Sequence, residues 1–212
     1  MVISIHYKTV SIQGWQVNVS EHEIRNTSWP AVKSELADQF FRISRVVAQQ
    51  PLEKLKTVIF WIHRNDPSGK CAAFNPSAQW LRDHGSDPHM AGGVEISNCA
   101  NFLDWTHQQP FMVLHELAHA YNFKFMKGGF KNQLIKNAFA LSMQNGKYNH
   151  VLHWDGKIAK AYATTNQMEY FAECTEAYFG QNDFFPFVNA ELKTFDPVAY
   201  KLMQEVWGNP VE

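Results

Sequence analysis

Basic residues are not in excess in this 212-residue sequence. Its 19 Lys and Arg residues are balanced by 20 Asp and Glu residues, and the formal net charge is −1. A protein that binds nucleic acid or an anionic membrane surface needs a positive field that attracts phosphates. The near-zero charge therefore argues against nucleic acid and membranes as partners.

Long apolar runs are missing as well. The longest is Val58-Ile-Phe-Trp-Ile62, which has the length of a strand and is too short to cross a membrane as a helix. The N-terminus shows no charged segment followed by an apolar one, as a secretory signal peptide does. We expect either a cytoplasmic chain or, preferably, a mature secreted or extracytoplasmic form whose signal has been removed. In both cases we expect a monomer.

Cysteine is scarce, and no C-x-x-C pair is present. Cys71, Cys99 and Cys174 are too few and too unevenly spaced for a disulfide framework. Cys174 lies in a strongly apolar segment, but no accompanying Cys/His arrangement makes it a candidate nucleophile. All three cysteines are therefore predicted to be small buried apolar residues.

The pattern H-E-x-x-H is present, at His115-Glu116-Leu-Ala-His119. Neither Pro nor Gly interrupts residues 111–127, and apolar residues recur at helical spacing, so residues 110–127 are predicted to form a helix. Histidines four apart share a helix face, and both imidazoles can reach one metal ion. This pair suits zinc, with Glu116 as the base that acts on a zinc-bound water. A chance match in a chain with 10 His residues is the alternative.

A catalytic zinc site needs a third protein ligand. The best donors are Glu169, Glu173 and Glu176, which share one face of a predicted helix from Asn166 to Phe179. A solvated acidic stripe is the alternative, but the helix is apolar nearly all round and is predicted to be buried. Buried carboxylates need a metal or a hydrogen-bond partner. We predict that Glu169 binds zinc and that Glu173 accepts the free N–H of a ligating histidine.

Other histidines are weaker candidates. His153 and Asp155 flank a predicted hairpin turn at Asp155-Gly156 and are possible ligands. His107 lies close to the start of the H-E-x-x-H helix and is predicted to be solvated. The remaining histidines have no partner pattern and are interpreted as surface or core residues.

A possible substrate strand precedes the H-E-x-x-H helix. Gly92-Gly93 leads into the short strand Val94-Glu95-Ile96. Glycine lets another backbone approach closely, and a free sheet edge can bind an extended peptide through main-chain hydrogen bonds. We predict that these five residues bind the substrate, and the alternative is an ordinary interior strand.

The rest of the chain predicts an α+β protein of one domain. Residues 1–107 form an α+β half with the substrate edge strand, and residues 108–212 form a mainly helical half with the zinc site. Turn residues predict a loop at Arg64–Lys70. Periodicity and end signals predict strands at 12–19, 56–63 and 92–97 and further helices at 28–51, 76–84, 130–144 and 196–207.

The two motifs together resemble the gluzincin metallopeptidases, in which H-E-x-x-H is followed by E-x-x-x-[D/E] on a later helix. Tyr162-Ala-Thr-Thr-Asn166-Gln-Met-Glu169-Tyr-Phe-Ala-Glu173 is more closely similar to the catalytic domains of anthrax toxin lethal factor and the Pro-Pro endopeptidases. This resemblance covers about residues 109–180. Segments 92–98 and 182–187 are also similar to uncharacterised bacterial zinc-peptidase-like proteins.

The resemblance implies a zincin-like metallopeptidase domain with a small mixed or antiparallel sheet, an H-E-x-x-H active-site helix and a mainly helical C-terminal half. It implies that one Zn²⁺ is bound by three ligands, His115, His119 and Glu169. Glu116 is then the base, Tyr162 stabilises the transition state, and Glu173 and Asn166 support the ligands from behind.

The expected substrate is a peptide or protein. Lethal factor carries large extra domains that this chain has no room for, so the substrate identity does not transfer. Two alternatives remain: a non-catalytic zinc-binding module on the same fold, and a hydrolase of non-peptide amides that uses the same residues. The presence of Glu116 and Tyr162 argues against the first, because a purely structural site needs neither.

Overall fold

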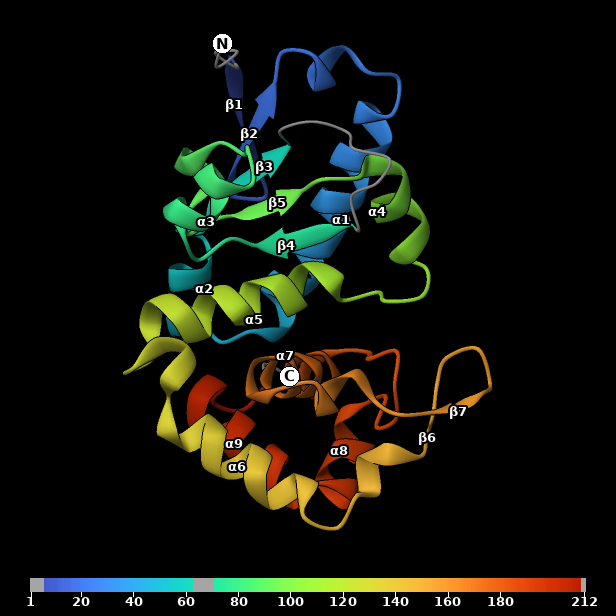
Figure 1. The fold of residues 1–212 in the computed structure, drawn as a ribbon. Helices are drawn as coiled ribbons and strands as arrows, with labels where there is room; N and C mark the ends of the chain where they lie inside the picture. The colour runs from blue at the N-terminus through green and yellow to red at the C-terminus, as the bar shows by residue number, and fades with distance from the viewer. Residues whose placement is uncertain (1–5, 63–70, 211–212) are drawn as a thin grey trace.

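The computed structural model describes residues 6–62 and 71–210. The loop predicted at 64–70 lies outside the described residues. The chain forms a mixed sheet with helices around it in the first half and a mainly helical second half, with α5 (Met112–Phe125) between the two (Figure 1). This arrangement confirms the predicted α+β class with a small mixed sheet.

The sheet has five described strands in the order β1-β2-β3-β5-β4. The β1–β2 and β4–β5 pairs are antiparallel, and β2–β3 and β3–β5 are parallel. A two-residue turn joins β1 to β2, and both Gln13 (φ 50°) and Gly14 (φ 86°) adopt the left-handed backbone that such hairpin turns require. The strand bounds are β1 Tyr7–Ile12, β2 Trp15–Ser20, β3 Phe60–Ile62, β4 Ala72–Phe74 and β5 Val94–Ile96.

Among the described residues, helices α1 to α4 belong to the first half and α5 lies between the halves, and α1 packs against the sheet and against α5. The predicted helix at 28–51 is two helices: the first ends at Val46, and Pro51 lies in the first turn of the second. Proline is tolerated in a first turn because its missing N–H has no partner there, so Pro51 does not act as the stop that we predicted. The bounds are α1 Trp29–Val46, α2 Gln49–Leu55, α3 Ala78–Asp83, α4 Cys99–Trp105 and α5 Met112–Phe125.

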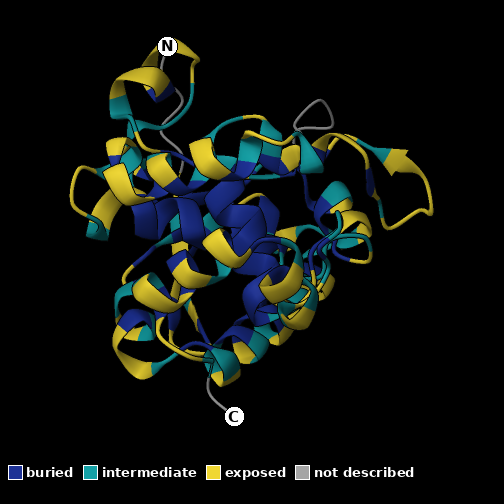
Figure 2. Ribbon diagram, turned by 90° about the horizontal axis from the view of Figure 1, so that it is seen from below, coloured by how far each residue is buried: buried dark blue, intermediate teal, exposed yellow. Residues whose placement is uncertain are grey.

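In the described part of the second half, helices α6 to α9 and a small hairpin lie below α5 (Figure 1). Helix α7 packs directly against α5, and ten of its 13 residues are buried, as the apolar sequence around the glutamates predicts. Buried residues gather at the centre of the molecule (Figure 2). The bounds are α6 Gln133–Met143, β6 Val151–Leu152, β7 Ile158–Ala159, α7 Gln167–Phe179, α8 Asn189–Phe195 and α9 Pro197–Trp207.

The predicted substrate edge at Gly92–Ile96 is wrong. Strand β5 is an interior strand, paired with β3 on one side and β4 on the other. A Cβ at Gly93 would lie 2.6 Å from the Ile59 carbonyl oxygen and 2.7 Å from Trp61 Nε1. Gly93 therefore permits the close approach of the chain's own neighbouring segment, and Gly92, Gly93, Val94, Glu95 and Ile96 are not available to an added strand.

The free edge belongs to β4, which pairs only with β5 among the described strands. This edge and the helix α5 beside it lie on the same side of the first half, facing the second half (Figure 1).

None of the described helices is both long and apolar enough to cross a membrane.

Candidate metal centre

Helix α5 presents its two histidines to α7. Leu114, Leu117 and Ala118 are fully buried and anchor the helix in the core. His115 and His119 are one turn apart and are also buried, and their ring centroids lie 4.8 Å apart. The sequence predicts this shared helix face, and both histidines line a cleft together with Glu169 of α7.

Helix α7 brings Glu169 to the histidines from the other side. The side-chain oxygen of Asn166 accepts hydrogen bonds from the backbone N–H groups of Met168 (2.8 Å) and Glu169 (3.0 Å). Asn166 is therefore the N-cap of α7, and it fixes the first turn, which carries Glu169. Asn166 thus acts on the backbone that carries Glu169, and its contacts with the described residues include none to the side chain of a predicted ligand.

The three residues converge. Glu169 Oε2 lies 3.1 Å from His115 Nε2 and 3.1 Å from His119 Nε2. One ligand atom from each of these residues lies within 4.8 Å of the other two, so the group could hold a metal ion. Burial acts against the charged carboxylate, but the two imidazole contacts outweigh it and lower the pKa of Glu169.

The partner of His115 Nδ1 is Glu176, not Glu173. Nδ1 donates to Glu176 Oε1 at 2.6 Å, while Glu173 Oε1 is 3.9 Å away. At about 100° per residue, Glu176 is about 20° from the direction of Glu169 around α7, and Glu173 is about 40° from it on the other side. Glu176 therefore lies closer than Glu173 to the face of α7 that carries Glu169. The prediction that Glu173 accepts this hydrogen bond was wrong.

Glu173 lies deeper and has other partners. Asn182 Nδ2 donates to Glu173 Oε2 at 3.1 Å. Burial and the neighbouring charge of Asp183 raise the pKa of Glu173 well above its usual value. Burial also raises the pKa of Glu176 to about 7, against the opposing effect of His115. The two buried glutamates thus share a strongly negative environment behind the His115 ring.

Glu116 points to the sheet edge. The backbone N–H of Phe74 in β4 donates to Glu116 Oε2 at 2.7 Å. The carboxylate is therefore held beside the His–Glu group without being one of the three converging residues. It lies on the wall of a cleft of about 710 Å³.

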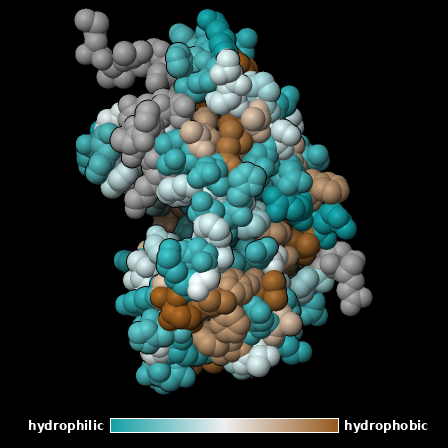
Figure 3. Space-filling view, turned by 90° about the vertical axis from the view of Figure 1, so that its right-hand side faces the viewer, coloured by the Kyte–Doolittle hydropathy of each residue, from teal (hydrophilic) through white to brown (hydrophobic). Residues whose placement is uncertain are grey.

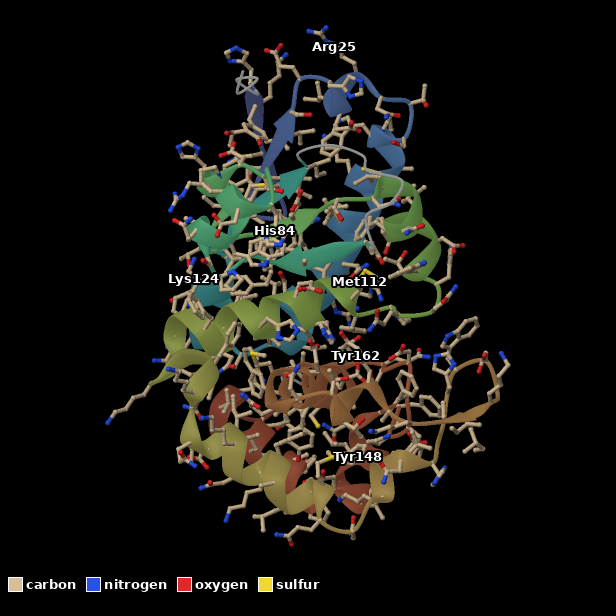
Figure 4. All side chains as sticks on the ribbon, viewed as in Figure 1. Arg25, His84, Met112, Lys124, Tyr148 and Tyr162 are labelled. Carbon is tan, nitrogen blue, oxygen red and sulfur yellow. The ribbon has the colours of Figure 1, made fainter. Side chains whose placement is uncertain are left out.

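Tyr162 lies after the hairpin and outside its strands. Strand β7 ends at Ala159, and Tyr162 begins a short 3₁₀ helix, Tyr162–Thr164, just before α7. Its ring is half-exposed at 46%, and its hydroxyl makes no hydrogen bond with any described residue. Figure 4 shows Tyr162 on the lower side of the space between the halves and Met112 of α5 on the upper side.

The cleft joins elements from both halves. Strand β4 and helix α5 line one side, and the hairpin segment, α7 and residues 183–184 line the other. Its described lining contains carboxylates, imidazoles and aromatic rings but neither Lys nor Arg. The residues are Cys71, Ala72, Ala73, Phe74, Trp105, Gln108, Gln109, Met112, His115, Glu116, His119, His153, Trp154, Tyr162, Glu169, Glu173, Asp183 and Phe184.

The other predicted candidates, His153, Asp155 and His107, lie outside the group formed by His115, His119 and Glu169. His153 Nδ1 contacts Asp155 Oδ1 at 2.8 Å within the exposed hairpin, and this pair is absent from the groups that could hold a metal ion among the described residues. His153 does line the cleft, whereas His107 is exposed. Neither is therefore a ligand in this arrangement.

The cysteines are free and buried, as predicted. Cys71 lies on the cleft wall, and burial raises its pKa to about 12. Burial raises the pKa of Cys99 to about 11 and that of Cys174 well above its usual value. A thiol with a raised pKa is protonated at neutral pH, which agrees with the prediction that the three cysteines are small buried apolar residues.

Sequence reasoning missed two parts of the site. One is β4, whose three residues are too few to show an alternating pattern. The other is Asp183, which follows α7 in a segment without regular structure. The alignment of Glu176 with Glu169, seven residues apart, was a usable signal for the partner of His115.

Comparison with known proteins identifies no relative. A scan against protein-family models, a search of curated proteins and a search of solved structures each found no match. The chemistry of the cleft is therefore inferred from the geometry of its own residues.

Proposed function

We propose that this chain is a zinc-dependent metalloendopeptidase of gluzincin type, with a zincin-like fold. The observation that carries the proposal is the convergence of two imidazole nitrogens and one carboxylate oxygen beside an open cleft. Two histidines and a glutamate form a known catalytic zinc ligand set. Ligand atoms around one tetrahedral zinc ion lie about 3.3 Å apart, from bond lengths of about 2.0–2.1 Å. The two 3.1 Å contacts of Glu169 fit that spacing.

Zinc held by His115, His119 and Glu169 would supply a Lewis acid that polarises the scissile carbonyl and makes water more acidic. Glu116 takes the proton from the attacking water as the new C–O bond forms. The same carboxylic acid then gives that proton to the leaving nitrogen as the C–N bond breaks. The hydrogen bond from Phe74 N holds Glu116 on the cleft wall, where this transfer takes place.

Tyr162 is suited to stabilise the oxyanion. Its ring centroid lies 6.4 Å from that of His115, and its hydroxyl has no partner among the described residues. Burial and the neighbouring Glu169 raise the pKa of Tyr162, so the hydroxyl keeps its proton. A neutral O–H that faces the cleft can donate to the oxygen on which negative charge develops, and this bond strengthens in the transition state.

The substrate backbone is best accommodated along β4. This strand is the free edge of the sheet among the described strands, and it lines the cleft next to Glu116. An extended peptide can add to such an edge through main-chain hydrogen bonds. We therefore assign to β4 the substrate-binding role that we predicted for Gly92–Ile96. Strand β4 pairs with β5 on the side opposite β3.

The rival functions differ in what the cleft must contain. A non-catalytic zinc module has no use for a carboxylate beside the metal group or for a free tyrosine hydroxyl across the cleft. Both are present here, at Glu116 and Tyr162, and this favours hydrolysis. A non-peptide amide hydrolase uses the same residues, and only a substrate screen distinguishes it from a peptidase.

The test uses purified protein with zinc content and peptide cleavage measured on the same samples. A mixed peptide library analysed by mass spectrometry gives the substrate. Glu116→Gln should retain about one zinc and lose cleavage, because it removes proton transfer and no ligand. His119→Ala is the matched variant that should lose both.

Three results would refute the proposal: full zinc content in His119→Ala, unchanged cleavage by Glu116→Gln, or no cleavage of any library peptide by zinc-loaded wild type. Cleavage of non-peptide amides alone would support the rival hydrolase.

A further inference from the structure

The free edge of β4 presents four backbone groups. Cys71 O accepts from Ser97 N at 2.9 Å, and Asn75 N donates to the residue before β5 at 2.9 Å, so both ends of β4 direct backbone groups toward β5. Successive residues of a strand alternate in the side to which their N–H and C=O point. Ala72 and Phe74 therefore each direct an N–H and a C=O away from β5, along the free edge.

One of these four groups is already occupied. Phe74 N donates to Glu116 Oε2 at 2.7 Å, which confirms that Phe74 faces outward. The other three groups, Ala72 N–H, Ala72 C=O and Phe74 C=O, have no outward hydrogen-bond partner among the described residues. The edge thus offers an added strand one donor and two acceptors.

The Phe74 N–H suits the proposed base better than it suits a substrate. Glu116 uses only Oε2 for this bond, and Oε1 has no hydrogen-bond partner in the described part of the chain. A hydrogen bond to an ionised carboxylate is about twice as strong as one to a neutral carbonyl. A substrate carbonyl therefore does not displace Glu116 from this N–H, and the base stays in place when a peptide binds.

We propose that the substrate binds to β4 through Ala72 N–H, Ala72 C=O and Phe74 C=O, while Phe74 N–H is reserved for Glu116. This inference rests on the proposed peptidase function and adds to it the register of the substrate strand. The two edge carbonyls take two substrate N–H donors. These donors lie on residues two positions apart, because only alternate residues of the substrate strand face the edge.

This register defines a class of substrate. Proline has no backbone N–H, so it is excluded from both alternating positions and accepted at the position between them, where the N–H points away from β4. A parallel and an antiparallel substrate strand give the same spacing of the two donors. The three bonds involve no side chain, so β4 selects for the backbone of an extended segment and against proline at two of its positions.

The edge is accessible from the cleft. Ala72, Ala73 and Phe74 line it together with Glu116, and neither Ala72 nor Ala73 is buried. The strand has three residues, which corresponds to about 10 Å of an extended chain. The described lining contains neither Lys nor Arg, so no cationic side chain of the lining competes for the two edge carbonyls.

The main test is the cleavage of a mixed peptide library by zinc-loaded wild type, since each proline in the library is a natural N–H deletion. The cleaved sequences, aligned at the cleaved bond, should show proline depleted at two positions two residues apart and retained between them. Each depletion should be about three- to tenfold, the scale of one backbone hydrogen bond. N-methylation of each backbone nitrogen of one cleaved peptide in turn should raise KM at the same two positions.

Ala72→Pro removes the one edge donor and leaves both acceptors. Proline is tolerated on an edge strand where its nitrogen faces outward. KM for the same peptide should rise about three- to tenfold while kcat and zinc content stay unchanged, because the bond stabilises substrate and transition state equally.

Ser11→Pro is the matched control on the opposite edge strand, β1. His6 O accepts from Glu21 N of the β2 side, so Ser11, five residues later, has its N–H outward by the same alternation. It lies outside the cleft lining and should change neither KM nor zinc content.

The reservation of Phe74 N–H is measured without any peptide. In wild type, NMR should show slower amide hydrogen exchange at Phe74 than at Ala72, because only Phe74 N–H has a hydrogen-bond partner. In Glu116→Ala, the Phe74 amide should exchange about as fast as that of Ala72.

Three results overturn the register: equal exchange at Phe74 and Ala72 in wild type, cleavage without the alternating loss of proline, or an unchanged KM in folded Ala72→Pro. Should Ala72→Pro not fold, the proline pattern of wild type decides. Absence of all cleavage refutes the peptidase function and the register together, whereas cleavage without the proline pattern refutes the register alone.

Discussion

The hydrogen bond between His115 and Glu176 gives the sharpest test of how the site is built. His115 Nδ1 and Glu176 Oε1 lie 2.6 Å apart, and neither side chain is more than 6% exposed. A carboxylate behind a ligating histidine orients the ring and raises its basicity, and removing it lowers metal affinity by about 10–100-fold. That range corresponds to about 1.4–2.7 kcal/mol of zinc binding energy.

Glu176→Gln and Glu173→Gln form a matched pair. Each replaces one buried carboxyl group behind His115 by an amide, but only Glu176 bonds its Nδ1, because Glu173 Oε1 is 3.9 Å away. The difference between the two variants therefore isolates the hydrogen bond from the general loss of a buried carboxyl group. Zinc affinity, measured by competition with a chelator, should fall further in Glu176→Gln by about tenfold. Equal losses, or a greater loss in Glu173→Gln, would refute the assignment.

Three further outcomes are expected. Tyr162→Phe should keep zinc content and Tm while kcat falls by about 10²-fold in a steady-state peptide assay, since one oxyanion donor is removed; unchanged kcat would make Tyr162 structural. Asp196→Asn should lower the free energy of unfolding in urea by about 3 kcal/mol, because its buried carboxylate accepts from Ser142, Tyr148 and Tyr170. These bonds outweigh burial and lower its pKa, so the wild-type advantage is present above about pH 4 and is lost as the pH falls through the lower, folded-state pKa. Cys71 should resist iodoacetamide at pH 8 until the protein is denatured, as its pKa of about 12 requires.

The convergence of His115, His119 and Glu169 was partly predictable because it depends on helix geometry. His115 and His119 lie four apart, so the helix alone sets their common direction, and Asn166 caps the helix that carries Glu169. Long periodic segments such as α1, α5 and α7 likewise follow from their own apolar spacing. In these cases the structure depends on residues that are close in the sequence.

The predictions from sequence were wrong where contacts between distant segments of the chain determine the structure. Strand β5 looked like an edge because its sequence does not show that β4, some twenty residues earlier, pairs beside it. The tight contact of Gly93 is with Ile59 and Trp61, and no local pattern distinguishes that contact from an approach by a substrate. Glu173 and Glu176 are neighbours on one helix, and their roles separate only when the direction of His115 is known.

The hairpin beside the cleft exposes apolar side chains. Leu152, Trp154 and Ile158 are all exposed, and apolar surface gathers on the lower part of that side of the molecule (Figure 3). Trp105 is exposed in the upper half, and both Trp105 and Trp154 line the cleft. In the function that we propose, aromatic rings on both sides of the cleft contact the side chains of an extended peptide whose backbone lies along β4.

The placement of the β4 edge also bears on self-association. An unpaired strand edge is a template on which other chains can stack, and many proteins block such edges with charge, proline or a covering element. Here the edge lines a cleft, Phe74 N is already engaged by Glu116, and the second half of the chain stands opposite. An edge with a wall opposite it is less open to the edge of another folded sheet than a fully exposed strand is. The proposed peptide-binding edge is therefore also partly protected against fibril-like growth.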